Sequence, residues 1–445
     1  MNRKSGSFFR LNKGLTMTNV TRIDRRQFIT RAAGTALGTL SFPYIVPSTV
    51  LGRAALSERI TLGFIGAGKQ SKHLMRSFLN SPGTHVVAAC DVDKLKLQRG
   101  KKIVEDHYAG KSGGSYKGCD TYGDFRDLLA RDDIDAVVIS TPDHWHAITV
   151  IQSAEAGKDI YCEKPLSQTI AEARAMVNAV RRYGRVFQTG SMQRSDWHFR
   201  LGCELVLNGY IGDLKHVTVG IGGPPGDKPL PAQPVPDYLD WDMWLGPALW
   251  RPYNEELSPH LSWDGFPNWR NHSSFGGGGM TDWGAHHFDI AQWGMGMDES
   301  GPVEIIPPDG KDYKVLTYKY ASGVTMTRDR ANGVLFTGTK GEVETNRGHL
   351  RTVPEDLKEK KLGPNEIHLY ESKNHYTDWL DAVRKRSKPI CDIETGCRSV
   401  TVCHLGNIAY KLGRPLKWDP EREVFIGDAG ANRLLSRPMR SPWRL

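Results

Sequence analysis

The sequence predicts an α/β fold, in which an N-terminal doubly wound parallel sheet precedes an α+β domain with a largely antiparallel open sheet. Two observations predict it. Between residues 60 and 190, short apolar runs alternate with helical stretches, as in a parallel sheet whose strands are joined by helices. After residue 195, later segments such as 324–327 carry apolar residues at every second position, which is typical of strands buried on one face.

The chain of 445 residues is too long for one ordinary core. We predict four parts: a signal region at 1–56, a nucleotide-binding domain at 57–195, a substrate-binding and oligomerisation domain at 196–420, and a basic tail at 421–445. Apolar runs beyond the N-terminal region are too short to span a bilayer. The formal net charge of +9 is scattered along the chain, so we expect no nucleic-acid partner.

The first part has the features of a twin-arginine signal. Arg25 and Arg26 are followed by Phe28 and then by a mildly apolar stretch at 32–46. An ordinary amphipathic helix is the alternative, but glycines and Pro43 would make it a poor one. We therefore expect an exported, periplasmic protein that uses the twin-arginine export machinery. This route carries folded proteins, which suits an enzyme that acquires its cofactor before export.

The cysteines indicate neither a disulfide framework nor a zinc ribbon. There are seven of them, an odd number, and no two form a Cys-x-x-Cys pair. Most are expected to be buried small apolar residues. A single disulfide within the evenly spaced set Cys391, Cys397 and Cys403 stays open.

The first predicted strand, at 60–65, leads into the pattern of a dinucleotide-binding turn. Gly66 permits a tight turn, Gly68 lets the backbone approach a pyrophosphate, and the following helix offers free N–H groups at its start. Ser71 stands where a third glycine is usual and keeps close packing possible. This arrangement is that of the Rossmann fold.

The second predicted strand, at 85–90, ends in Asp91. A carboxylate at this place can accept both ribose hydroxyls and would repel a 2'-phosphate. We therefore expect NAD rather than NADP, although two nearby cations, Lys69 and Lys94, argue in the direction of NADP. A solvated turn residue is the plain alternative for Asp91.

Two more predicted strands, at 134–139 and 159–162, end in polar motifs. Thr141, Pro142 and His146 follow the first, and the run Glu163-Lys164-Pro165 follows the second. Ligands of open parallel sheets bind at the carboxyl ends of the strands. On the residues alone, Lys164 could equally form a surface ion pair with Glu163.

These motifs, with Ala156-Gly157-Lys158 between them, resemble the glucose-fructose oxidoreductase, inositol dehydrogenase and rhizopine-catabolism family, called Gfo/Idh/MocA, over residues 58 to about 420. The resemblance implies that Lys164 reaches both the substrate and the nicotinamide ribose, with Pro165 in a strained or cis arrangement. It also places several residues at the cofactor, namely Thr141, Pro142, His146 and Glu163. It further implies a homodimer or homotetramer formed through the open sheet.

A second motif of the family follows the glycine run at 276–279. Asp282, His286 and Asp289 are spaced so that one helical face would carry all three, whereas His287 points away and is expected either behind the site residues or in the core. The resemblance implies that Asp282 and His286 form the catalytic pair, with His286 as general acid/base. Histidine suits this role by its ordinary pKa, and Lys164 can stabilise an alkoxide.

A metal site is the rival interpretation of these histidines and carboxylates, but the tight spacing of a strong metal site is missing, so we expect none. Substrate contacts are predicted for Arg194 and Trp197, which follow the last strand of the first sheet, and for Asp289. The segment 222–271 is rich in Pro, Gly and Trp and is expected to cap the pocket. Alternatively, Trp241, Trp244 and Trp250 fill a small satellite core.

The sequence therefore predicts an NAD-dependent oxidoreductase that acts on a secondary alcohol of a sugar or polyol, with Lys164, Asp282 and His286 as catalytic residues. An NAD-assisted glycosidase of the same fold is the alternative, although exported glycosidases of this kind depart from the Glu-Lys-Pro pattern. A non-catalytic sugar-binding protein is the third hypothesis, and the three intact catalytic residues argue against it.

Overall fold

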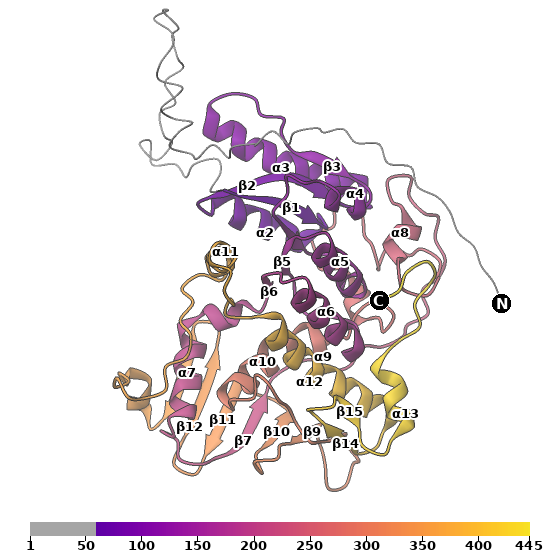
Figure 1. The fold of residues 1–445 in the computed structure, drawn as a ribbon. Coiled ribbons are helices and arrows are strands. Elements are labelled where there is room, and N and C mark those ends of the chain that lie inside the picture. Colours follow the sequence, from indigo (N-terminus) through magenta and orange to yellow (C-terminus); the bar gives the residue numbers. More distant parts are fainter. Residues whose placement is uncertain (1–58) are drawn as a thin grey trace, which may run out of the picture. The chain divides into compact units, whose positions relative to one another are not determined.

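The computed structural model describes residues 59–445, so the predicted twin-arginine signal lies outside the described residues. No helix in this range is long and apolar enough to cross a membrane. The described residues form two sheets with their covering helices (Figure 1).

The first sheet has six parallel strands in the order β3-β2-β1-β4-β5-β6. Their bounds are β1 Ile60–Ile65, β2 Thr84–Cys90, β3 Asp120–Tyr122, β4 Ala136–Ile139, β5 Asp159–Cys162 and β6 Phe187–Thr189. The chain order reverses between β1 and β4, which is the point where a doubly wound sheet binds its ligand. The predicted parallel sheet is confirmed.

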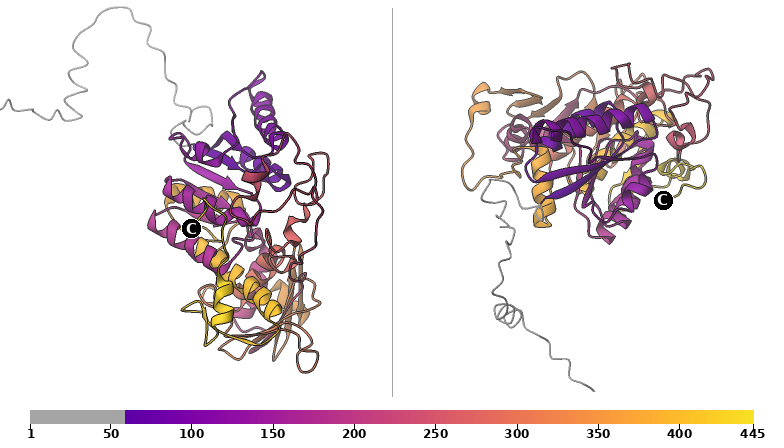
Figure 2. Two further views of the ribbon diagram at one scale, coloured as in Figure 1. Left: turned by 90° about the vertical axis from the view of Figure 1, so that its right-hand side faces the viewer. Right: turned by 90° about the horizontal axis from the view of Figure 1, so that it is seen from above.

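Helices cover both faces of this sheet (Figure 2). Adjacent residues of one strand point to opposite faces, so Val137 belongs to one apolar cluster and Val138 to the other. One face packs α2 Lys69–Asn80, α3 Lys94–Ser112 and α11 His375–Lys385; the other packs α4 Phe125–Leu129, α5 Asp143–Glu155 and α6 Ile170–Arg182.

The second sheet has nine strands in the order β13-β12-β11-β7-β10-β9-β8-β14-β15. Its strand pairs are antiparallel except for β7 with β10, as the predicted α+β domain requires. The bounds are β7 Leu214–Val219, β8 Glu304–Ile306, β9 Thr317–Lys319, β10 Thr325–Arg328, β11 Val334–Gly338, β12 Glu342–Asn346, β13 His349–Val353, β14 Leu416–Asp419 and β15 Val424–Phe425.

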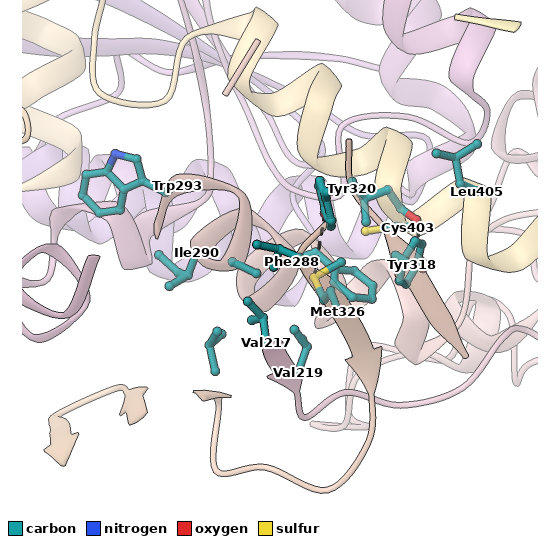
Figure 3. Packing of buried hydrophobic residues seen from close by; sticks show 14 of the residues in the cluster. Val217, Val219, Phe288, Ile290, Trp293, Tyr318, Tyr320, Met326, Cys403 and Leu405 are labelled. Carbon is teal, nitrogen blue, oxygen red and sulfur yellow. Dashed lines mark hydrogen bonds between the residues drawn. The ribbon is translucent and has the colours of Figure 1, made fainter. Parts of the chain in front are cut away.

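One face of this sheet packs against α7 Trp197–Leu207, α10 Gly284–Gly294 and α12 Ile393–Leu412. Figure 3 shows Phe288 and Ile290 of α10 against Val217 of β7 and Met326 of β10. Every residue of α10 is buried. Since α10 carries His286, this packing holds the predicted base in place.

Helix α12 joins the two parts of the fold. Its first residues, Ile393 and Cys397, belong to the core of the parallel sheet, whereas Val402 and Leu405 belong to the core of the second sheet. All seven cysteines are buried and free, so the disulfide left open among Cys391, Cys397 and Cys403 does not form.

The segment 222–271 contains α8 Trp241–Leu245 and builds a separate apolar cluster. Trp241 and Trp244 stack in it with ring centroids 4.6 Å apart, as the satellite-core alternative predicts for them. Trp250 is 69% exposed and lies outside this cluster. At the C-terminus, after α13 Ala429–Asn432, Trp443 packs edge-on against Trp145 of α5.

Candidate active site

A cavity of about 620 Å³ lies at the carboxyl ends of the parallel strands. Its walls come from three regions: the β1–α2 turn and Asp91, the loops that follow β4 and β5, and the second domain with α9 Gly279–Asp282, the start of α10 and the segment 257–270. The two predicted motifs, far apart in the chain, therefore face one cavity.

The nucleotide end of the cavity is a backbone cradle. Gly66 has a φ of +91°, and a Cβ there would lie 2.8 Å from the carbonyl carbon of Ser140. A Cβ on Gly68 would meet nothing within 4 Å, so open space adjoins the start of α2. The helix has no side-chain cap, which leaves its first N–H groups free. These features fit the pyrophosphate of a dinucleotide. Ser71 is buried behind this turn and outside the cavity lining.

Asp91 is held by the backbone at this end. Its Oδ2 accepts from the Ala67 N–H at 2.6 Å and its Oδ1 from the Asp93 N–H at 2.8 Å. Burial raises the pKa of Asp91, and the positive charge of Lys96 opposes this shift. Lys96 and Arg99 also line the cavity, so the carboxylate that fits ribose hydroxyls has cations beside it.

The loops after β4 and β5 are tied together by His146. Its ring nitrogens lie 2.9 Å from the carbonyl oxygen of Pro165 and 3.0 Å from that of Thr141. Burial lowers the pKa of His146 to about 4. Thr141 and Pro142 line the cavity, whereas His146 lies behind them and supports the loop that carries Lys164. The peptide bond between Lys164 and Pro165 is cis.

Glu163 lines the cavity and is 4% exposed. Its carboxylate accepts a hydrogen bond of 3.0 Å from the side-chain amide of Gln70 on α2. Burial raises the pKa of Glu163. Glu163 makes this bond, while its neighbour Lys164 turns to the second domain.

The Lys164 ammonium donates to Asp282 at two atoms, Oδ1 at 2.7 Å and the backbone oxygen at 2.9 Å. Burial alone would raise the pKa of Asp282, but the charge and hydrogen bond of Lys164 and the charge of Arg270 outweigh it and hold that pKa below its ordinary value. Asp282 is therefore an anion that positions Lys164. The surface pair of Lys164 with Glu163, open on sequence grounds, is replaced by this contact between the domains.

His286 lies at the same end of the cavity and is 4% exposed. Its Nδ1 is buried and has no hydrogen-bond partner in the described residues. Burial lowers the pKa of His286 well below its ordinary value, and the charges of Lys164 and Arg347 lower it further. The imidazole is therefore neutral and able to accept a proton. His287 donates from Nδ1 to the Gly220 carbonyl at 2.8 Å, a structural contact.

Comparison with known proteins agrees with this geometry. Residues 60–191 match the model of the oxidoreductase family's NAD-binding Rossmann fold, and residues 223–445 match that of its C-terminal alpha/beta domain. The chain belongs to the Gfo/Idh/MocA family. An uncharacterized oxidoreductase, YrbE, of Bacillus subtilis is 23% identical over 392 residues, which cover 83% of this chain and 99% of the relative.

Two further likenesses involve proteins of known class. A glycosyl hydrolase family 109 protein of Shewanella pealeana is 29% identical over 212 residues, but the match covers only 44% of this chain and 45% of that protein. The crystal structure of aldose-aldose oxidoreductase from Caulobacter crescentus, complexed with glycerol, shares the fold with a TM-score of 0.53 and 19% identity. That match covers 81% of this chain and 99% of the other.

Three residues predicted to contact substrate lie away from the lining of the cavity in this family member. Arg194 is 2% exposed and pairs with Asp289 at 2.9 Å and with Asp298 at 2.7 Å. Trp197 is 56% exposed and stacks on the His198 ring. The Arg194–Asp289 pair braces α10 from behind, so its placement supports a positioning role rather than substrate contact.

The shared helical face predicted for Asp282, His286 and Asp289 is divided in the structure. The helix is interrupted at Trp283, so Asp282 ends α9 and His286 lies in α10. Asp282 then faces Lys164, while Asp289 turns to Arg194. The interruption separates the carboxylate from the imidazole and gives the two groups different partners.

Several cavity residues carry no signal in the sequence. Arg347 enters from the β12–β13 turn, Arg270 from the capping segment, and Asp143 from the first turn of α5. Arg270 Nε lies 3.8 Å from Asp282 Oδ1. Burial raises the pKa of Asp143 well above its ordinary value. These side chains belong to loops or helix starts whose place depends on how the domains dock.

The capping segment closes over the nucleotide end. Asp264 pairs with Lys72 of α2 at 3.3 Å and also contacts Lys69, whose ammonium lies 4.8 Å from the Phe266 ring centroid. Lys96 donates to Ser258 at 3.2 Å. Residues 258–267 thus form a strap across the start of α2. Among residues 59–445, no group of three or more His, Cys, Asp or Glu side chains could hold a metal ion.

Proposed function

We propose that the protein is an NAD-dependent oxidoreductase that moves a hydride between the cofactor and a secondary alcohol of a sugar or polyol. One observation carries this proposal: the Lys164–Asp282 pair and the neutral His286 face the same cavity as the dinucleotide cradle. When bound, NAD supplies the hydride acceptor.

The protein residues supply proton transfer and charge stabilisation. His286 accepts the hydroxyl proton as the carbon loses its hydride, because its neutral imidazole lines the cavity beside Lys164. The Lys164 ammonium stabilises the developing alkoxide, and Asp282 positions that ammonium. In the reverse direction, protonated His286 returns the proton to the carbonyl oxygen.

The substrate class rests on the family and on the fold shared with the aldose-aldose oxidoreductase. The test is to mix the purified protein with NAD or NADP and a panel of aldoses and polyols, and to follow the nicotinamide absorbance. We expect reduction of NAD by at least one of them, and loss of that rate in Lys164→Met. Unchanged turnover in Lys164→Met would refute the assignment.

A glycosidase that oxidises a sugar transiently, eliminates the leaving group and then reduces the product is a second candidate. The partial match to glycosyl hydrolase family 109 proteins favours it. Chromogenic glycosides distinguish the two, since only the glycosidase releases the chromophore without net NAD reduction. Equimolar NAD(H) released on denaturing the purified protein would support such redox-neutral chemistry, and an empty protein would support an exchangeable cofactor.

Export is also part of this proposal. The paired arginines at 25 and 26 direct the folded protein through the twin-arginine machinery to the periplasm. Replacement of both by lysine should leave the protein in the cytoplasmic fraction. Periplasmic recovery of that variant would contradict the assignment.

A further inference from the structure

Arg347 is a cation at the catalytic end of the cavity. It lies in the turn between β12 and β13, and it lines the cavity with Trp283 and His286. Its guanidinium carbon lies 5.1 Å from the centroid of the Trp283 ring, which is 43% exposed. Stacking on an indole face holds a guanidinium in one orientation while its edge stays free.

The Gln193 side chain holds one edge of this guanidinium. The amide lies between the His286 carbonyl oxygen and Arg347 Nε, and with its nitrogen toward the carbonyl it bonds to each at 3.1 Å. Within the part of the chain that the structure describes, the two terminal nitrogens of Arg347 have no hydrogen-bond partner and are left for another group. Two parallel N–H groups of this kind match the two oxygens of a carboxylate.

Arg347 is exposed and forms no ion pair within the described chain, unlike two other cations, Arg351 and Lys164. On the same hairpin, Arg351 pairs with Glu342 and Glu344. In the cavity, Lys164 pairs with Asp282. Within residues 59–445, Arg347 forms no ion pair; its guanidinium lies over the Trp283 ring and its Nε meets Gln193. An unpaired guanidinium beside the base is suited to a substrate that brings a negative charge.

We propose that the substrate of this site is an acid sugar, such as a uronic or aldonic acid, and that Arg347 binds its carboxylate against the Trp283 face. A single planar guanidinium with two free donors fits one carboxylate of charge −1. A phosphate dianion would call for further donors at the same place. This inference rests on the proposed function, because Arg347 must bind the same sugar molecule that reacts at Lys164 and His286.

The test compares matched pairs, glucuronate with glucose and galacturonate with galactose, as substrates. We expect higher kcat/KM for the acids, and in Arg347→Gln a loss of roughly 10- to 100-fold for the acids through KM, well beyond any change for the neutral sugars. Arg347→Lys should lose part of this preference. Arg351→Gln, on the same hairpin but outside the cavity lining, should leave both classes unchanged.

A wild type that prefers neutral sugars, or an Arg347→Gln variant that loses both classes equally, would overturn the inference. So would a preference for a sugar phosphate over the uronate. Calorimetric binding of glucuronate and glucose to the protein with NADH needs no turnover. Arg347-dependent binding of the acid without hydride transfer would refute the proposed reaction alone, whereas turnover restricted to neutral sugars would refute this inference alone.

Discussion

His286 and His287 are adjacent buried histidines with different surroundings. His287 donates from Nδ1 to a backbone carbonyl and lies outside the cavity lining. Each of the two rings has one buried nitrogen without a partner in the described residues, so hydrogen bonding alone does not distinguish them. His286 faces the cavity beside Lys164. This difference in position assigns the proton transfer to His286.

Replacement of each histidine by asparagine tests the assignment. His286→Asn should lower kcat by roughly a hundred- to ten-thousand-fold, because it removes the general base. His287→Asn is the matched control and should retain most turnover, with a loss of stability of about 1 kcal/mol from its altered hydrogen bond. Steady-state rates and thermal unfolding of both variants give the answer. Equal loss of activity in the two would indicate that α10 is merely perturbed.

The pH dependence follows from the lowered pKa of His286. The base must be unprotonated, so kcat/KM should be constant at neutral pH and should fall only as the pH drops through this pKa, below 6.5. Arg347 is one of the cations that lower it, so Arg347→Gln should move the acid limb to higher pH. The pH profile of kcat/KM for a neutral sugar, recorded for the wild type and for Arg347→Gln, measures the position of the acid limb and its shift. An acid limb that moves to lower pH in the variant would contradict the predicted direction of the shift.

At the scale of elements, the strap at 258–267 joins the second domain to the start of α2. Its contacts, Asp264 with Lys69 and Lys72, cross the nucleotide end of the cavity. Exposed ion pairs contribute modestly, so the strap is held weakly enough to open. It therefore fits a closing segment that limits cofactor exchange.

Asp264→Ala should speed the release of NADH by a few-fold, because it removes the carboxylate that pairs with Lys69 and Lys72 of α2. Asp237→Ala is the control, since Asp237 is exposed in the segment 222–271, lies outside the strap and forms no ion pair within the described chain. Stopped-flow displacement of NADH measures the rates. The closing role is wrong if both variants release NADH at the wild-type rate.

At the scale of the whole molecule, the nine-stranded sheet has one face on helices and another that is only partly buried. In β11, Val334 and Phe336 point into the core, so Leu335 points to the other face. Burial of such a face against a second copy would stabilise a dimer or tetramer.

Leu335→Glu should shift the protein toward the monomer, because it would bury a charge where the nine-stranded sheets of two copies meet. The hydrophobic core of each copy would be unchanged. Lys311→Glu, a charge change on an exposed loop, serves as the control. Light scattering after size-exclusion chromatography gives the mass. A wild-type monomer, or a Leu335→Glu variant with unchanged mass, would rule out assembly through this face.

The sequence by itself determined four strands of the parallel sheet, β1, β2, β4 and β5, and the places of Gly66, Asp91 and Lys164 at their ends. The reason is local: periodic apolar runs define strands, and the carboxyl ends of parallel strands meet at one edge. The turn at Gly66 also needs a backbone conformation that glycine adopts readily.

The partners of the charged residues were decided only by the tertiary structure. Lys164 donates a hydrogen bond to Asp282, which lies 118 positions away in the chain. Asp289, which we predicted to contact substrate, instead accepts a hydrogen bond from Arg194. Arg347 has no sequence pattern at all, since a hairpin turn carries it to Trp283. These contacts depend on how the two domains dock across α12, and docking is set by the packing of whole cores rather than by any short stretch of sequence.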